Sequence, residues 1–337
     1  MSRHINIPIF VPHLGCPHQC SFCNQRSISG RQAFSLEEVE KTVEASLSTA
    51  AGAEVEIAFF GGSFTGIDRS LMIEILSRVQ PYLKNGAVSS LRCSTRPDYI
   101  NEEVLEILSR YGMKTVELGI QSMNNEVLSV SHRGHTAAQS EYAARLLVER
   151  GFSFVGQMMV GLPGASPESE KETAERICAL GAVGARVYPT VVFRKTPLCA
   201  EAEAGLYRPL SLPEAVSRAA DCVEIFRARD VKLLRVGLQS SESLSDPEEV
   251  FGGPVHSAMG ELVESEIYKR KLVSLLQNEK KAPCLRIFVA KGCASAAVGQ
   301  NRSNKSYLCQ KFGFRRVTVE ECEVLCKGDI KIKTEER

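Results

Sequence analysis

The sequence lacks long apolar runs, low-complexity tracts and internal repeats. No apolar stretch approaches the roughly 20 residues that a membrane-spanning helix needs, so we expect no membrane protein. The N-terminus, MSRHINIPIF, has neither the apolar segment nor the cleavage site of a secretory signal peptide, and we therefore expect a cytoplasmic protein. Tryptophan is also absent, but this excludes no class of function.

Charge of one sign is not in excess, because the formal net charge is only +1. That balance hides an asymmetry: residues 268–337 hold sixteen Lys and Arg against seven Asp and Glu. Such a basic segment can attract a polyanion such as RNA, although a solvated basic surface is the more common explanation.

Strand and helix patterns alternate through the first 240 residues. Short apolar runs typical of strands lie at 5–11, 55–60, 88–94, 115–120, 152–160 and 185–193, and a weaker one lies at 231–238. Helical patterns separate them, at 35–50, 68–83, from Asn101 onward, and at 137–150, 167–180 and 213–229. Ser35 and Glu38 predict a capping box at the first helix. Strict alternation predicts a parallel sheet in an α/β fold, a partial (β/α)6-type TIM barrel.

The chain changes character after this region. Residues 241–256 are rich in Ser, Asp, Gly and Pro and are predicted to be a linker between a barrel domain, 1–240, and a small basic α/β domain, 257–337. The small domain is expected to contain a helix at about 257–277, a strand at 284–290, a helix at 303–311 and one or two short strands.

Twelve cysteines in a cytosolic chain indicate reduced thiols or metal ligands rather than disulfides. Cys16, Cys20 and Cys23 form a CxxxCxxC motif directly after the first strand. A [4Fe–4S] cluster has four irons, so three cysteines would leave one iron open to a further ligand. The alternatives are structural zinc, with His13 or His18 as the fourth ligand, or three buried thiols.

Polar and glycine residues also follow the other predicted strands. Gly61, Gly62 and Ser63 follow the second strand, Arg96 follows the third, Gln121 ends the fourth and residues 161–164 follow the fifth. In α/β barrels the chemistry lies on the loops at the C-terminal ends of the strands. The sequence therefore predicts an active site at this rim.

These motifs resemble the radical S-adenosylmethionine (radical SAM) superfamily, whose signature is CxxxCxxC. Over roughly two thirds of the chain, several stretches are similar to the catalytic subunit of the Elongator complex and its bacterial and archaeal relatives. These stretches are FGGSFTGID (60–68), STRPDYI (94–100), VELGIQSMNNEVL (116–128), HRGHT (132–136) and GARVYPTVVFRKTPL (184–198).

The resemblance implies two cofactors and a mechanism. Cys16, Cys20 and Cys23 would ligate three irons of a [4Fe–4S] cluster, and the fourth iron would bind the amino and carboxylate groups of SAM. One electron, from a donor such as ferredoxin or flavodoxin, would split SAM into methionine and a 5′-deoxyadenosyl radical. That radical would abstract a hydrogen atom from the substrate.

The resemblance also implies roles for residues around the cysteines. The glycine motif would approach the methionine amino group, with Ser63 in place of the more usual acid, and an aromatic would lie near the adenine. A charge-assisted pairing to the SAM carboxylate would come from an arginine, whose alternative is an ordinary salt bridge. The predicted SAM-binding residues are Phe22, Gly61, Gly62, Ser63, Arg96, Gln121, Gln157 and Val160 with the 160–163 segment; Glu117 could contact SAM or substrate.

Weaker candidates each have an ordinary structural explanation. His132 and His135 could touch an anionic substrate, and Tyr188 could donate a hydrogen atom in radical chemistry. Five C-terminal cysteines could hold a second cluster, but structural thiols are favoured: Cys284, Cys293, Cys309, Cys322 and Cys326. Four more cysteines are expected in the core: Cys93, Cys178, Cys199 and Cys222.

Elongator-type proteins continue into an acetyltransferase domain. About 98 residues follow Gln239 here, without a convincing acetyl-CoA loop, so we do not expect acetyl-CoA chemistry. Three functions stay open: a radical SAM enzyme acting on RNA such as tRNA, one acting on a small metabolite or cofactor like coproporphyrinogen oxidase, or a non-catalytic sensor of iron, redox state or SAM.

Overall fold

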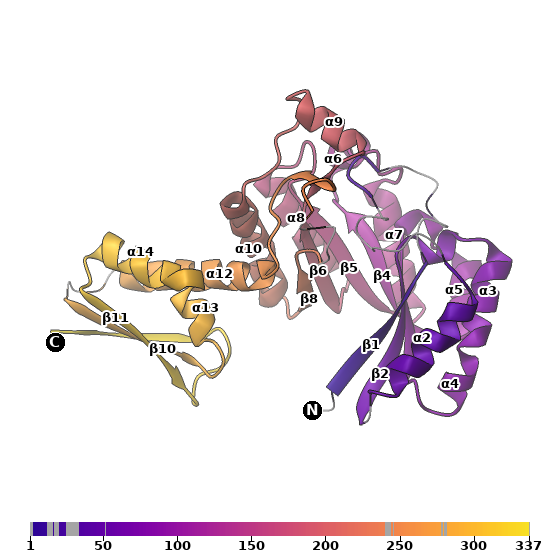
Figure 1. The fold of residues 1–337 in the computed structure, drawn as a ribbon, viewed down its shortest axis with the longest axis horizontal. Coiled ribbons are helices and arrows are strands. Elements are labelled where there is room, and N and C mark those ends of the chain that lie inside the picture. Colours follow the sequence, from indigo (N-terminus) through magenta and orange to yellow (C-terminus); the bar gives the residue numbers. More distant parts are fainter. Residues whose placement is uncertain are drawn as a thin grey trace.

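The computed structural model describes residues 3–11, 16, 20–24, 34–50, 52–239, 244, 246–277, 279 and 282–336. Its largest element is a curled sheet of seven parallel strands (Figure 1). In spatial order these are β1 (Arg3–Phe10), β2 (Ala53–Phe60), β3 (Ser90–Thr95), β4 (Met113–Gln121), β5 (Ser153–Val160), β6 (Gly184–Pro189) and β8 (Lys232–Val236). Parallel neighbours need long crossover connections, which is why helical segments separate them in sequence.

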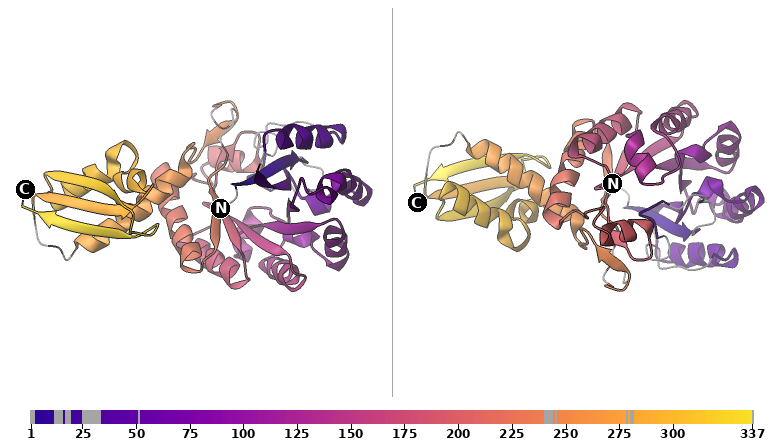
Figure 2. Two further views of the ribbon diagram at one scale, coloured as in Figure 1. Left: turned by 90° about the horizontal axis from the view of Figure 1, so that it is seen from below. Right: turned by 90° about the horizontal axis from the view of Figure 1, so that it is seen from above.

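Helices cover the outer face of the curled sheet (Figure 2). They are α2 (Glu37–Leu47), α3 (Arg69–Arg78), α4 (Gln80–Lys84), α5 (Glu102–Arg110), α7 (Ala137–Glu149), α8 (Pro167–Ala179) and α10 (Leu212–Ala228). Every second strand residue faces this layer, as Ile57 and Phe59 of β2 and Phe154 of β5 do, and these side chains are fully buried with Leu76 of α3 and Phe226 of α10. The main core therefore lies between sheet and helices.

Four short helical segments lie in the connections between these elements. They are η1 (Phe64–Gly66), η2 (Pro97–Tyr99), α6 (Asn125–Val130) and α9 (Pro197–Glu203). The first three follow the C-terminal ends of β2, β3 and β4 and thus begin at the rim where the candidate residues were predicted.

The predicted partial barrel is confirmed, with seven strands instead of six. The weaker pattern at 231–238 forms β8, which pairs with β6. The pattern at 185–193 is divided, because β6 ends at Pro189 and β7 (Val192–Phe193) pairs antiparallel with β9 (Val250–Gly252). β9 falls within the segment that was predicted to be a linker, 241–256, so part of that segment packs onto the barrel.

Local capping chemistry accounts for the start of several helices, but not for that of α2. The side chains of Asp68 and Asn101 cap α3 and α5. The predicted capping box of Ser35 and Glu38 is wrong: the N-cap of α2 is Leu36 without a side-chain bond, and the Glu38 N–H donates to the Ser35 backbone carbonyl at 3.3 Å.

A second, smaller sheet lies in the C-terminal region. It has the order β11-β10-β12 and consists of β10 (Cys284–Ala290), β11 (Arg316–Cys322) and β12 (Ile330–Glu335). One of its faces packs on α12 (Met259–Leu276), α13 (Ala294–Val298) and α14 (Ser303–Phe312), with η3 (Gln300–Arg302) before α14. The predicted strand 284–290 matches β10, whereas the short helix α13 was not anticipated.

Helix α12 belongs to two cores at once. Its first half buries Met259, Val263 and Ile267 in the barrel core, and its second half buries Leu272 and Leu276 in the small core. Figure 1 shows it extending from the barrel to the C-terminal sheet. A single continuous helix therefore connects the two regions. Among the described residues, no helix is both long and apolar enough to cross a membrane.

The small core should depend on the buried face of α12. We expect Leu272→Ala to lower the free energy of unfolding by about 3 kcal/mol, because Leu272 is fully buried and its removal leaves a cavity. Leu275→Ala on the same helix should cost less than about 1 kcal/mol, since Leu275 is 42% exposed. Urea denaturation followed by circular dichroism measures both; equal losses would contradict the assignment of the buried face.

Candidate functional site

The candidate residues gather at one edge of the large sheet. Cys16 follows β1, Ser63 follows β2, Arg96 follows β3, Gln121 ends β4 and Gly161 follows β5. Because the strands are parallel, their C-terminal ends lie at the same edge. Side chains from distant parts of the sequence are therefore close together there.

Backbone hydrogen bonds connect Ser21, in the cysteine loop, to the end of α6 and the start of α9. The Ser21 N–H donates to the Ser131 carbonyl at 3.1 Å, and the Leu198 N–H donates to the Ser21 carbonyl at 2.9 Å. Within the loop, the Cys23 N–H donates to the Cys20 carbonyl at 3.1 Å. Cys20 is buried, whereas Cys16 and Cys23 are half-buried. The thiol of Cys20 is thus the most enclosed of the three.

Two arginines reach the Cys20 sulfur. Arg133 Nη1 donates to Cys20 Sγ at 3.3 Å, and Arg96 Nη1 lies 3.9 Å from the same atom. Both side chains are buried, with relative exposures of 7% and 2%. Sequence reasoning considered the histidines beside Arg133 and missed the arginine itself, although it belongs to the HRGHT stretch.

Arg96 is held by Asp98 in a bidentate ion pair. Its Nε and Nη2 donate to the two carboxylate oxygens, each at 2.9 Å. His135 Nδ1 lies 3.9 Å from Asp98 Oδ1. Burial, followed by the charges of Arg133 and Arg96, lowers the pKa of His135 to about 3, so its ring is neutral at physiological pH. His135 therefore brings no charge for an anionic substrate, and His132 is exposed.

The glycine motif after β2 has a backbone that only glycine adopts easily. Gly61 has a φ of 110°, which places it in the region that side chains disfavour. Ser63 is buried, and its Oγ lies 3.5 Å from Cys16 Sγ. This segment, with Gly62 between the two, therefore lies beside the cysteine loop.

Gln121, which ends β4, contacts Gln157, which lies within β5. Gln157 Nε2 donates to Gln121 Oε1 at 3.4 Å. Gln121 has a φ of 67°, unusual for a residue with a side chain, at an irregularity in the pairing of β4 with β5. Such strained positions occur often at functional sites.

The loop after β5 is held by a buried ion pair. Glu170 of α8 accepts from the Gly161 N–H at 2.6 Å and from Arg218 of α10 at 2.6 and 2.7 Å. Arg218 also donates to the Ala165 carbonyl at 3.1 Å, and the Tyr207 hydroxyl donates to the Gly161 carbonyl at 2.6 Å. Both ends of residues 161–165 are thereby tied to the helix layer.

The segment 160–163 has side chains on both sides of the sheet. The side chain of Val160 is fully buried in the main core with Met158, so it faces the helices. Leu162 instead packs in one apolar cluster with Cys20 and Phe22. Of this predicted SAM-binding segment, Leu162 therefore lies beside the cysteine loop, whereas the Val160 side chain faces away from it.

The inner face of the sheet carries a line of alternating charges. Arg92 of β3 donates to Glu56 of β2 at 3.3 Å, and its guanidinium lies 3.7 Å from the Glu117 carboxylate of β4. Glu117 in turn accepts from Arg186 of β6 at 2.9 Å. Arg186 also donates to the Tyr188 hydroxyl at 3.3 Å. Burial raises the pKa of Tyr188, so its hydroxyl keeps its proton. Glu117 is thus paired inside the barrel.

The donor set at the cysteine loop fits an iron–sulfur cluster, whose irons take thiolate ligands. Among the described residues, no three His, Cys, Asp or Glu side chains are placed to hold one metal ion. The guanidinium groups of Arg96 and Arg133 near Cys20 Sγ would compensate the negative charge of a thiolate there. His13 and His18 of the zinc alternative lie outside the described residues.

The C-terminal cysteines do not gather. Cys284 begins β10 and Cys322 ends the neighbouring β11, at opposite ends of their pairing. Six residues of strand separate them, about 20 Å. Cys293 is buried and Cys326 exposed, so one cluster cannot take the set. These positions therefore favour structural thiols over ligands of a second cluster.

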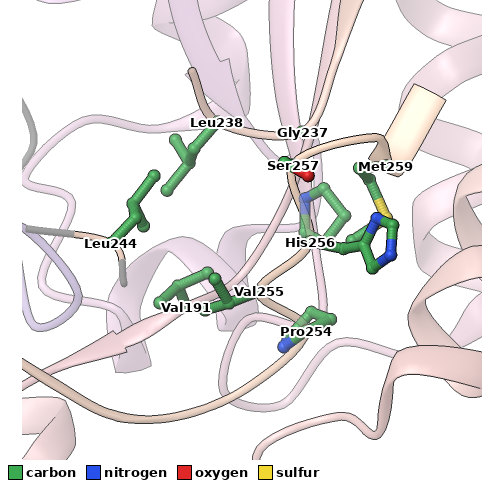
Figure 3. A pocket seen from close by; sticks show the side chains of 10 residues that line it. Val191, Gly237, Leu238, Leu244, Pro254, Val255, His256, Ser257 and Met259 are labelled. Carbon is green, nitrogen blue, oxygen red and sulfur yellow. The ribbon is translucent and has the colours of Figure 1, made fainter. Parts of the chain in front are cut away.

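A pocket opens at the C-terminal ends of β6 and β8 (Figure 3). Leu238, Leu244 and Met259 are among its apolar lining residues, and His256 is a polar member. The Nδ1 atom of His256 accepts from the Ala258 N–H at 3.1 Å. None of the predicted site residues is among the described lining residues.

Comparison with known proteins finds family matches over most of the chain. Residues 10–177 match the model of the radical SAM superfamily, and residues 182–269 match that of the radical SAM C-terminal domain. An uncharacterized protein of Methanocaldococcus jannaschii is 30% identical over 232 residues, 65% of this chain and 70% of that protein. A tRNA uridine(34) acetyltransferase of the same organism is 26% identical over 243 residues, 60% of this chain.

The chain spans only 45% of the length of that acetyltransferase. Among solved structures, the archaeal Elp3 of Methanocaldococcus infernus with an N-terminal deletion has a TM-score of 0.65 at 21% identity, covering 81% of this chain and 64% of that one. Methylornithine synthase has a TM-score of 0.51 at 16% identity, covering 71% of this chain and 74% of that one. Both support the fold.

The loop after β5 should lose its anchor when Glu170 is neutralised. We expect Glu170→Gln to lower the free energy of unfolding by about 3 kcal/mol, because Arg218 is then left as a buried charge without its carboxylate. Glu168→Gln on the same helix should cost less than about 1 kcal/mol, since its side chain is 76% exposed. Chemical denaturation measures both variants, and an equal effect would refute the anchoring role.

Proposed function

We propose that this chain, which belongs to the radical SAM superfamily, holds its cluster through Cys16, Cys20 and Cys23 and acts on RNA, with tRNA as the favoured class. Membership makes the chain a radical SAM enzyme with a [4Fe–4S] cluster and SAM as cofactors. The observation that carries the ligand assignment is the pair of buried arginines at the Cys20 sulfur, since a thiolate is the anion that they would stabilise.

When bound, these cofactors supply an electron that cleaves SAM and a 5′-deoxyadenosyl radical that takes hydrogen from the substrate. The chain's own residues would bind and orient. The backbone at Gly61, Gly62 and Ser63 would face the methionine end of SAM, and Phe22 with Leu162 would provide an apolar surface for the adenine. A low-potential one-electron donor such as ferredoxin or flavodoxin would supply the electron.

Gln121 and Gln157 would offer amide groups to SAM or substrate, since their side chains are already in contact.

Arg96 donates through Nε and Nη2 to the two carboxylate oxygens of Asp98. We therefore propose it as a partner of Cys20 rather than of the SAM carboxylate. The charged line from Glu56 to Arg186 would keep the inner face polar and hold it rigid beneath the bound molecules.

The RNA proposal is supported by the small sheet. Leu285 and Ile287 of β10 and Ile332 of β12 pack toward the helices, so Lys331 and Lys333, which alternate with Ile332, lie on the opposite face. Both lysines are exposed. Phe288, which pairs in register with Lys331, adds a half-exposed ring on which a base could stack. The tRNA-acting relative points to the same substrate class.

Catalysis is tested on protein purified without oxygen. About four irons and four sulfides per chain are expected, and 5′-deoxyadenosine should form after dithionite and SAM are added. Cys20→Ala should abolish both cluster and product. Cys93→Ala is the matched control, because Cys93 is also fully buried but faces the helix core, and it should keep both.

Zinc without iron would refute the proposal. A cluster that binds SAM without forming 5′-deoxyadenosine would show a sensor instead of an enzyme, and a product that survives in Cys20→Ala would refute this ligand set.

RNA binding is tested through its salt dependence. Replacing Lys331 and Lys333 together with Gln should weaken binding of bulk tRNA and reduce the slope of log K against log salt by about 2, since each phosphate contact contributes about 1. The matched control replaces the exposed Lys41 and Lys84 on α2 and α4 with Gln and should leave the slope unchanged. Filter binding measures both; equal slopes in all three proteins would contradict an RNA contact on this sheet.

A further inference from the structure

Arg133 is a buried cation without a carboxylate partner. Its Nη2 donates to the Gly119 carbonyl at 2.6 Å, its Nη1 donates to Cys20 Sγ at 3.3 Å, and its Nε has no hydrogen-bond partner. Within the described part of the chain, no Asp or Glu oxygen forms a salt bridge with it, although only 7% of its surface is exposed. Within the described residues, the Cys20 sulfur is thus its candidate counter-charge.

The backbone at Gly119 is shaped around this guanidinium. A side-chain carbon at Gly119 would lie 2.8 Å from Arg133 Nη2, closer than real contacts allow. The strand therefore leaves room for the arginine to reach both the carbonyl and the sulfur. Arg133 is held in place by β4 and is directed at Cys20.

Arg96 differs from Arg133 because its charge is already neutralised. Asp98 binds it through two hydrogen bonds of 2.9 Å, and its Nη1 is 3.9 Å from Cys20 Sγ. His135, the remaining titratable group beside them, is neutral. The net positive charge next to Cys20 therefore comes from Arg133.

An unpaired buried charge is costly, and it is tolerated where an anion compensates it. Hydrogen bonds to the sulfurs and nearby net charge are among the factors that set the reduction potential of an iron–sulfur cluster. One electron added to the cluster makes it more negative by one charge, so a nearby cation favours the reduced form. In a buried site this effect is weakly screened.

We propose that Arg133 is a positioning residue that raises the reduction potential of the cluster held by Cys16, Cys20 and Cys23. The inference rests on the proposed function, because it requires that cluster. The electron comes from a one-electron reductant, dithionite in the experiment, and is taken up by the cluster without bond cleavage. Arg133 acts through the Cys20 sulfur and needs no contact with SAM.

The test is a redox titration followed by electron paramagnetic resonance on anaerobic full-length protein. In Arg133→Gln the equilibrium constant for reduction of the cluster should fall about tenfold. This corresponds to a reduction potential more negative by about 59 mV for a one-electron couple. Arg133→Lys keeps the charge and should shift less. Arg110→Gln makes the same change of net charge on the exposed surface of α5 and should not shift the potential.

Iron and sulfide content is measured on every variant, so that potentials are compared only between proteins that hold an intact cluster. Equal potentials in wild type and Arg133→Gln would overturn the inference while leaving the proposed function intact. If Arg133→Gln cannot hold a cluster, the neutral variant Arg133→Met decides by the same measurement: a potential below the wild-type value supports the inference, and an unchanged potential overturns it. A wild-type protein without a cluster would overturn both proposals.

Discussion

Parallel pairing is the constraint on which the rest of this structure depends. Strands that run in one direction cannot be joined by tight turns, so each connection crosses the outer face as a helix. All seven C-terminal ends then lie at one edge, where Cys20 meets Arg96 and Arg133, which are 76 and 113 residues away in the sequence. The site is thus a consequence of strand direction, and it is built from loops that lie far apart in the sequence.

Buried charge is the second theme of the molecule. On the inner face Glu56, Arg92, Glu117 and Arg186 alternate in sign across four strands, so each ion has an opposite neighbour. Barrels of the closed type fill this space with branched apolar side chains instead. Among the described residues Arg133 is an exception to this pairing, because the group that faces it is the sulfur of Cys20, which is proposed as a cluster ligand. The buried arginine without a carboxylate partner therefore lies at the proposed cluster site.

The small domain is connected to the barrel by continuous secondary structure. Helix α12 contributes to both cores, and Arg270 in its middle donates to the Ser217 carbonyl at 2.9 Å and to the Asp221 carboxylate at 2.5 Å on α10. A basic sheet carried on such a helix has a defined position relative to the rim. If it binds RNA as proposed, the domain would set where along the RNA the barrel can act.

The sequence by itself determined the periodic elements, the parallel sheet and the spacing of Cys16, Cys20 and Cys23, because these depend on neighbours within a few residues. It failed at Ser35, where a backbone turn replaced a side-chain cap, and it did not show that the Val160 side chain faces the helices. Only the tertiary structure decided that Arg133 reaches Cys20. That contact arises from the pairing of distant parallel strands, and local residue patterns carry no information about which distant groups will meet.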